Sequence, residues 1–145
     1  MKAVGSILRQ GSAAARSGGS DTMWTIRGFL LLQIVIFLSM ITIHFGLLIG
    51  GYSHRGAGAA ESVITAILVA GLLLTWMPPL WSRRAASAAQ SIGILGVLLG
   101  LFTIALGIGP RTILDLAVNG VLLLALIAGL AFTRWKRLRI QRACC

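Results

Sequence analysis

Long runs of apolar residues, separated by short polar segments, divide most of the chain. Four runs approach or exceed the roughly 20 helical residues that cross a hydrocarbon core, and they cover residues 28–51, 59–77, 87–109 and 112–133. Backbone amide and carbonyl groups must bond to one another in lipid, so such runs are expected to be helices. The pattern therefore predicts an all-α polytopic membrane protein, a four-transmembrane-helix bundle built from two hairpins.

Polar residues, glycine and proline between the runs predict where the helices begin and end. Pro78 and Pro79 are expected to stop the second helix, because proline lacks an amide hydrogen. Ser87 and Gln90 form an S-x-x-Q capping pattern, which predicts that the third helix starts at Ser87. Thr112 is expected to cap the fourth helix in the same way.

Composition supports a membrane location. Charged residues make up 11% of the chain and apolar residues 57%, whereas soluble domains carry about 25% charged residues. The expected organisation is a flexible cytoplasmic N-terminal tail over residues 1–27, a four-span bundle over 28–133 and a basic cytoplasmic C-terminal tail over 134–145. The first of these is expected to be flexible because Gly, Ser and Ala are frequent in it.

The basic residues predict orientation and partners. The net charge is +10, which in a soluble protein would point to nucleic acid; here the basic residues flank the apolar runs, which favours anionic lipid instead. All of them except Arg55 and Arg111 lie on the side of the two termini, so the positive-inside rule places both termini in the cytoplasm. The Arg-, Ala- and Gly-rich composition is typical of bacteria and indicates the inner membrane. The residues expected to contact lipid head groups are Arg83, Arg84, Arg134, Lys136, Arg137 and Arg139.

Small residues recur along one face of the predicted third helix. In lipid, helices associate through close packing, for which small side chains are favourable. Two interpretations remain open: the stripe packs inside the bundle, or it contacts another subunit. The glycines expected to take part are Gly93, Gly96, Gly100 and Gly107.

Both histidines and two of the acids lie near the predicted outer turns. His44 is expected about two turns inside the first span, roughly 10 Å below the surface at 1.5 Å per residue. Glu61 and Asp115 fall in the predicted first turns of the second and fourth helices, where the helix dipole favours a carboxylate by roughly 0.3–1 kcal/mol. That position explains both acids without a ligand. His54 is expected to be solvated in the turn.

A second interpretation joins these residues into one site. Glu61 and Thr65 share a helix face, and so do Asp115 and Asn119, because each pair is four residues apart. Polar groups inside a membrane usually face the bundle interior or a wet cavity. The alternative is therefore an outward-facing polar vestibule that binds a cation or relays a proton, lined by His44, Glu61, Thr65, Asp115 and Asn119.

The sequence contains no catalytic motif that we can identify. One histidine in a predicted span is too few for a bis-histidine haem, and there is no Cys-x-x-Cys pair or glycine-rich phosphate loop. We therefore expect a non-enzymatic protein without a cofactor or metal. The favoured function is an accessory, assembly or interaction subunit that packs through small-residue helix faces, in a homo-oligomer or a larger membrane complex. The alternative is a small transporter or a proton- or cation-linked channel that uses the vestibule.

Overall fold

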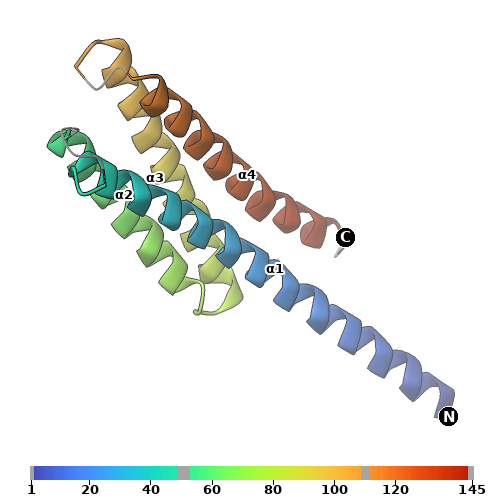
Figure 1. The fold of residues 1–145 in the computed structure, drawn as a ribbon. Coiled ribbons are helices and arrows are strands. Elements are labelled where there is room, and N and C mark those ends of the chain that lie inside the picture. The colour runs from blue at the N-terminus through green and yellow to red at the C-terminus, as the bar shows by residue number, and fades with distance from the viewer. Residues whose placement is uncertain (1, 49–52, 109–111, 144–145) are drawn as a thin grey trace.

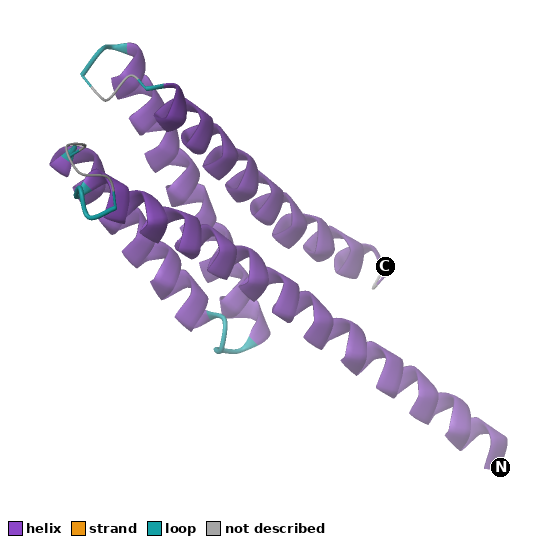
Figure 2. Cartoon of the chain, viewed as in Figure 1, coloured by secondary structure: helices purple, strands orange, loops and turns teal. Residues whose placement is uncertain are grey.

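The computed structural model is a bundle of four long helices (Figures 1 and 2). It describes the backbone of residues 2–48, 53–108 and 112–143, and the side chains of 22–48, 53–78, 81–108 and 112–135. The helices are α1 (Lys2–His44), α2 (Arg55–Leu74), α3 (Pro79–Ala105) and α4 (Ile113–Ala143), and the described residues contain no strand. This confirms the predicted all-α four-helix fold.

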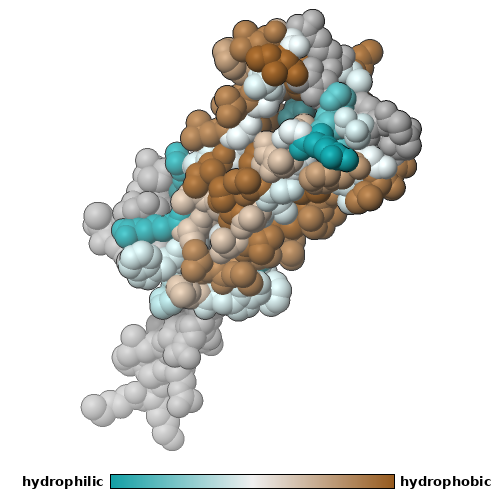
Figure 3. All heavy atoms as spheres, turned by 90° about the vertical axis from the view of Figure 1, so that its left-hand side faces the viewer, coloured by the Kyte–Doolittle hydropathy of each residue, from teal (hydrophilic) through white to brown (hydrophobic). Residues whose placement is uncertain are grey.

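Each helix contains a segment that is long and apolar enough to cross a membrane. These segments are Thr22–His44, Arg55–Leu74, Trp81–Ala105 and Ile113–Trp135. Large apolar side chains on the outside of the bundle are exposed, as a lipid-facing surface requires, and Figure 3 shows mainly hydrophobic surface with hydrophilic groups towards the two ends. The chain is therefore a multi-pass membrane protein.

Consecutive helices run antiparallel and pack side by side. α1 packs on α2, α2 on α3 and α3 on α4, and α4 closes the bundle against α1 (Figure 1). Both ends of the chain leave the bundle on the side of the α2–α3 turn, which we call the termini end. The α1–α2 and α3–α4 turns lie at the opposite end, which we call the far end.

The first and last helices continue into the segments predicted as tails. α1 begins at Lys2 and α4 ends at Ala143, whereas the sequence predicts tails over residues 1–27 and 134–145. The residues between Lys2 and the first span include many good helix formers and no proline. A membrane span supplies a helix that is already nucleated, so extension beyond it costs little.

α1 and α3 end earlier than predicted, at glycines that adopt a left-handed backbone conformation. α1 stops at His44 because Gly46 has φ 73°, and the Leu47 amide donates to the Thr42 carbonyl oxygen at 2.9 Å. Gly107, with φ 81°, follows the end of α3 in the same way. This is the Schellman arrangement, which glycine adopts without steric penalty. Gly107 therefore terminates α3, although the sequence suggested that it packs within the helix.

The predicted start of the third helix at Ser87 is wrong. α3 begins about two turns earlier, at Pro79, so Ser87 and Gln90 lie in its interior. Pro78 flanks the helix, and Pro79 occupies a first-turn position where no amide hydrogen is needed. Gln90 is fully buried in the bundle and is not a capping residue.

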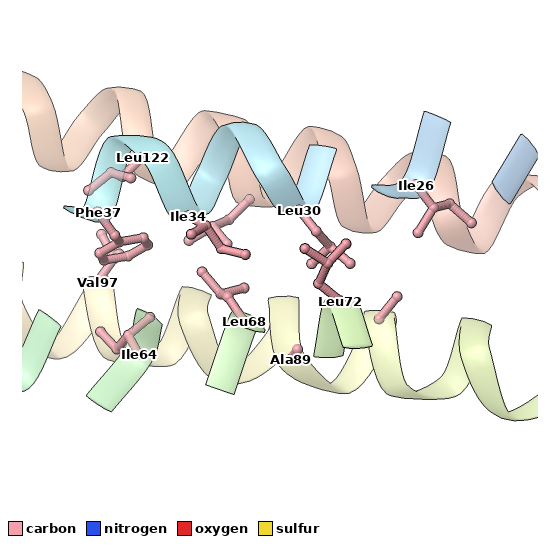
Figure 4. Packing of buried hydrophobic residues seen from close by; sticks show 12 residues of the cluster. Ile26, Leu30, Ile34, Phe37, Ile64, Leu68, Leu72, Ala89, Val97 and Leu122 are labelled. Carbon is pink, nitrogen blue, oxygen red and sulfur yellow. The ribbon is translucent and has the colours of Figure 1, made fainter. Parts of the chain in front are cut away.

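A continuous apolar core runs along the bundle axis (Figure 4). It is formed by side chains from all four helices, which are Ile26, Leu30, Ile34, Phe37, Ile64, Leu68, Leu72, Ala86, Ala89, Val97, Leu122 and Leu126. In lipid, such packing holds helices together through close contact, since there is no water to exclude.

The small residues of α3 face its neighbours within the bundle. A Cβ atom on Gly71 of α2 would lie 2.5 Å from the Ala89 Cβ atom, and one on Gly96 would overlap the Ile64 side chain. A Cβ atom on Gly93 would lie 3.0 Å from Leu126 of α4. The stripe is thus used for close approach of α3 to α2 and α4.

Aromatic and basic side chains gather at the termini end. Arg27 donates to the Thr75 carbonyl oxygen at 3.0 Å, and its guanidinium carbon lies 4.5 Å from the centre of the Trp76 ring. Four tryptophans are exposed there, as are Arg84 and Arg134; the side chains predicted to contact lipid at 136, 137 and 139 lie outside the described residues. The tryptophans are Trp24, Trp76, Trp81 and Trp135.

Candidate functional site

His44, the last residue of α1, lies between two carboxylates at the far end of the bundle. Its Nδ1 atom is 2.8 Å from Oε2 of Glu61 on α2, and its Nε2 atom is 3.3 Å from Oδ1 of Asp115 on α4. His44 and Asp115 are each 2% exposed. One imidazole therefore joins three of the four helices, and we call these three residues the His44 cluster.

The turn after α1 explains why a residue at a helix end is buried. The chain reverses at Gly46, and the amide of His54 then donates to the His44 carbonyl oxygen at 2.8 Å. The predicted depth of two turns inside the first span is wrong, because α1 ends at His44. His54 is exposed, as predicted, and its ring centre lies 6.5 Å from that of His44 in an edge-on orientation.

Asp115 lies in the first turn of α4 and also contacts His44. Its amide donates to the Thr112 hydroxyl oxygen at 3.1 Å, and that hydroxyl donates to Asp115 Oδ2. This confirms the predicted cap at Thr112 and the predicted position of Asp115 in the first turn. The two carboxylate oxygens thus have different partners, since Oδ2 accepts from the cap and Oδ1 faces the imidazole.

Glu61 does not occupy the helix-start position that the sequence suggested. α2 begins at Arg55 and has no acidic residue in its first turn, so Glu61 lies in the second turn. The helix dipole falls off within the first turn, and it does not account for a carboxylate at this position. The Glu61 side chain is largely buried, and its ion-pair partner is His44.

The two remaining residues of the predicted vestibule bond to their own helices. Thr65 donates to the Glu61 carbonyl oxygen at 2.7 Å, and Asn119 donates to the Asp115 carbonyl oxygen at 2.8 Å. Asn119 lines the cleft described below, whereas Thr65 is buried beside it. The structure thus brings His44, Glu61, Asp115 and Asn119 to one cleft and leaves Thr65 outside its lining.

The His44 cluster lines a cleft of about 920 Å³ between the helices of the far half. Most of its walls are apolar and come from α2 and α3, including Ile64, Ile67, Ile92 and Leu95. The exposed residues Ser53, His54 and Arg55 also line it. Clefts of about 300–1,000 Å³ with apolar walls and a few converging polar groups are typical of small-molecule sites.

The contacts of the imidazole define what the cluster can do chemically. A protonated imidazole donates from both ring nitrogens, one to each carboxylate, whereas a neutral one has a single N–H. After loss of one proton, one carboxylate faces a bare nitrogen unless it carries a proton itself. The geometry therefore suits a group that stores and passes protons. No set of three or more described His, Cys, Asp or Glu residues is arranged to hold a metal ion.

A second buried polar pair lies nearer the termini end, and the sequence analysis does not predict that its two residues meet. Gln33 of α1 and Gln90 of α3 are both 0% exposed, beside Gly129 of α4. Gln33 donates to the Ala125 carbonyl oxygen at 3.0 Å. The sequence signal is a glutamine inside each of two apolar runs, but the S-x-x-Q pattern predicts a capping position for Gln90.

No family model, curated protein or solved structure matches this chain.

Proposed function

We propose that the protein is a non-enzymatic, proton-linked transporter or channel, and that the His44 cluster binds the proton. The observation that carries this proposal is a buried imidazole with a carboxylate at each ring nitrogen, in a chain that crosses a membrane. Removing ions from water costs several kcal/mol each, and ionisable residues inside membranes usually mark ion pathways or proton relays. Histidine is suited to this role because it exchanges its proton near neutral pH.

The cleft supports access to the cluster from the far end. His44, Glu61 and Asp115 line it together with exposed residues of the α1–α2 connection. Its apolar walls suit a small, largely apolar molecule that moves with the proton. The arrangement thus favours the transporter, which the sequence offered as the alternative.

The proposal is tested with purified protein in liposomes that contain a pH-sensitive dye. An imposed pH gradient should collapse faster than in protein-free liposomes. Glu61→Gln and His44→Gln should return the rate to that of protein-free liposomes, since neither amide takes up a proton. Asp21→Asn removes the remaining acid of the chain, outside the four spans, and should retain the wild-type rate. A wild-type rate equal to that of protein-free liposomes would contradict the proposal.

An accessory or assembly subunit is the second candidate, and a different observation favours it. Ala66 and Ala70 lie one turn apart on the exposed side of α2, where their small side chains would allow a helix from another subunit to approach closely. Affinity purification in mild detergent, followed by mass spectrometry, tests this candidate. A stoichiometric protein partner that is lost from Ala66→Leu would support it.

We further propose that the termini end faces the cytoplasm and that the protein resides in the inner membrane. The excess of basic residues near that end supports this orientation. Exposed Arg84 and Arg134 are placed to contact anionic lipid head groups, and half-buried Arg83 lies beside them. The tryptophans of the termini end are of the kind enriched at the membrane–water interface.

Topology reporters provide the check on this orientation. A reporter that is active only in the cytoplasm should be active when fused after Cys145, because four spans return the chain to its starting side. A reporter that is active only in the periplasm should be active when inserted at Gly56, at the far end of α2. A periplasmic signal from the Cys145 fusion would show that the orientation is reversed or that one span does not cross.

A further inference from the structure

The interior of the bundle contains two polar regions that are separated by apolar side chains. The first is the His44 cluster in the far half. The second is the pair Gln33 and Gln90; further towards the termini end the buried polar residues Thr133, Ser82 and Thr22 lie among the apolar core side chains. Between the two regions lie Phe37, Ile64, Val97 and Leu122, which Figure 4 shows together and which we call the apolar layer.

The glutamine pair has more hydrogen-bonding capacity than the protein fills. Among the described residues, no partner is present for Gln33 Oε1 or for either amide atom of Gln90. A Cβ atom on Gly129 would lie 2.5 Å from Gln90 Nε2 and 2.8 Å from Gln33 Nε2, so both amides converge on one point of α4. Buried polar groups without a protein partner are commonly satisfied by internal water.

We propose that Gln33 and Gln90 bind water inside the bundle, and that this hydrated site carries protons between the apolar layer and the termini end. An amide does not titrate, but it donates and accepts hydrogen bonds and can orient a chain of water molecules. The Thr133 hydroxyl, which donates to the Gly129 carbonyl oxygen at 2.8 Å, comes next along α4 towards the termini end. The transport part of this inference rests on the proposed function, whereas the water site does not.

The apolar layer separates the hydrated site from the cleft. Phe37, Ile64 and Val97 line the cleft, and Gln33 lies on α1 one helical turn from Phe37 on the side of the termini end, about 6 Å away at 1.5 Å per residue. Apolar constrictions in membrane pathways close by excluding water. The cleft thus lies on one side of the apolar layer and the two glutamine amides lie on the other. In this proposal a proton crosses when water enters the apolar layer.

A structural role for the amides makes a different prediction. Gln33 connects α1 to α4 through its bond to Ala125, and if the pair serves only to hold helices together, its removal lowers stability. If the pair serves to bind water, Gln33→Leu/Gln90→Leu should remain folded, because two polar side chains are replaced together by apolar ones of similar size. Its thermal unfolding temperature in detergent should equal or exceed that of the wild type.

Water contact is measured directly by solid-state NMR. Protein labelled with ¹⁵N in its glutamine side chains is reconstituted in liposomes, and magnetisation is transferred from water. The chain has four glutamines, and the signals of Gln33 and Gln90 are identified by their loss in the single leucine variants. Both signals should receive magnetisation from water, while ¹³C-labelled Val97 methyl groups in the apolar layer should not. Dry amides at both positions would overturn the inference.

Proton flux provides the second measurement. Gln33→Leu/Gln90→Leu should lose flux, and Gln10→Leu, the same change outside the four spans, should keep it. Wild-type flux in the folded double variant would overturn the route through the amides. Absence of flux in the wild type would reject the proposed function and with it the proton route; the NMR result then decides the water site by itself, for or against.

Discussion

Replacing Gly71 by leucine should leave little folded protein in the membrane. Even a Cβ atom at this position would lie 2.5 Å from the Ala89 Cβ atom, which is attached to the α3 backbone and cannot rotate away. The larger side chain must therefore push α2 and α3 apart at this contact. Overpacking typically costs about 1–3 kcal/mol and occasionally more, and the total stability of a protein is only about 5–15 kcal/mol. Size-exclusion chromatography of detergent extracts should show a strong loss of the monodisperse peak.

Gly120→Leu is the matched control for this prediction. A Cβ atom on Gly120 of α4 would meet no atom within 4 Å, so the same substitution should be tolerated. Gly96→Leu is expected to be intermediate, because the obstacle there is the flexible end of the Ile64 side chain. Equal yields from the Gly71 and Gly120 variants would show that the close approach of α2 and α3 is not required for folding.

Replacing Asp115 by leucine should destabilise the far end of the bundle. The change removes the acceptor for the Thr112 hydroxyl and the carboxylate that faces His44 Nε2. Glu61 remains as a partner of His44, so the main loss at the imidazole is one hydrogen bond to a charged group, which typically contributes about 1.5–3 kcal/mol. Thermal unfolding in detergent should therefore show a large decrease in melting temperature.

Two further variants separate the contributions of Asp115. Asp115→Asn keeps an oxygen that accepts a hydrogen bond, so its melting temperature should lie between those of the leucine variant and the wild type. Thr112→Ala removes the helix cap, including the hydroxyl that donates to Asp115 Oδ2, and keeps the carboxylate that faces His44; a cap typically contributes about 1 kcal/mol. If Asp115→Leu is no less stable than Thr112→Ala, the contact with His44 contributes nothing to folding.

The fold was largely predictable from the sequence, because apolar runs of membrane-spanning length leave the chain few alternatives to helices. The errors occurred at the boundaries, where a local motif competes with its context. Ser87 and Gln90 fit a capping pattern, but the helix formed by the preceding residues continues through them. Gly46 lies within an apolar run, and only its left-handed conformation shows that α1 ends there.

The members of the site were predicted better than their arrangement. The sequence groups His44, Glu61 and Asp115 because all three fall near the outer turns, but their contacts depend on how three helices meet. Helical spacing predicts that Thr65 joins the site because it shares a helix face with Glu61, but its hydroxyl bonds to the backbone of its own helix. Patterns along one helix carry no information about the partner that another helix supplies.

The His44 cluster connects three of the four helices at the far end and leaves one helix outside these contacts. The imidazole ties the far ends of α1, α2 and α4 to one another, and among the described side chains α3 contributes none to these ion pairs. Towards the termini end, α3 is held against α2 at Gly71 and Ala89. The far half of α3 is therefore not fixed by the cluster and can pivot about that contact relative to the other three helices. Swinging its far end would widen or narrow the cleft without breaking any bond of the cluster.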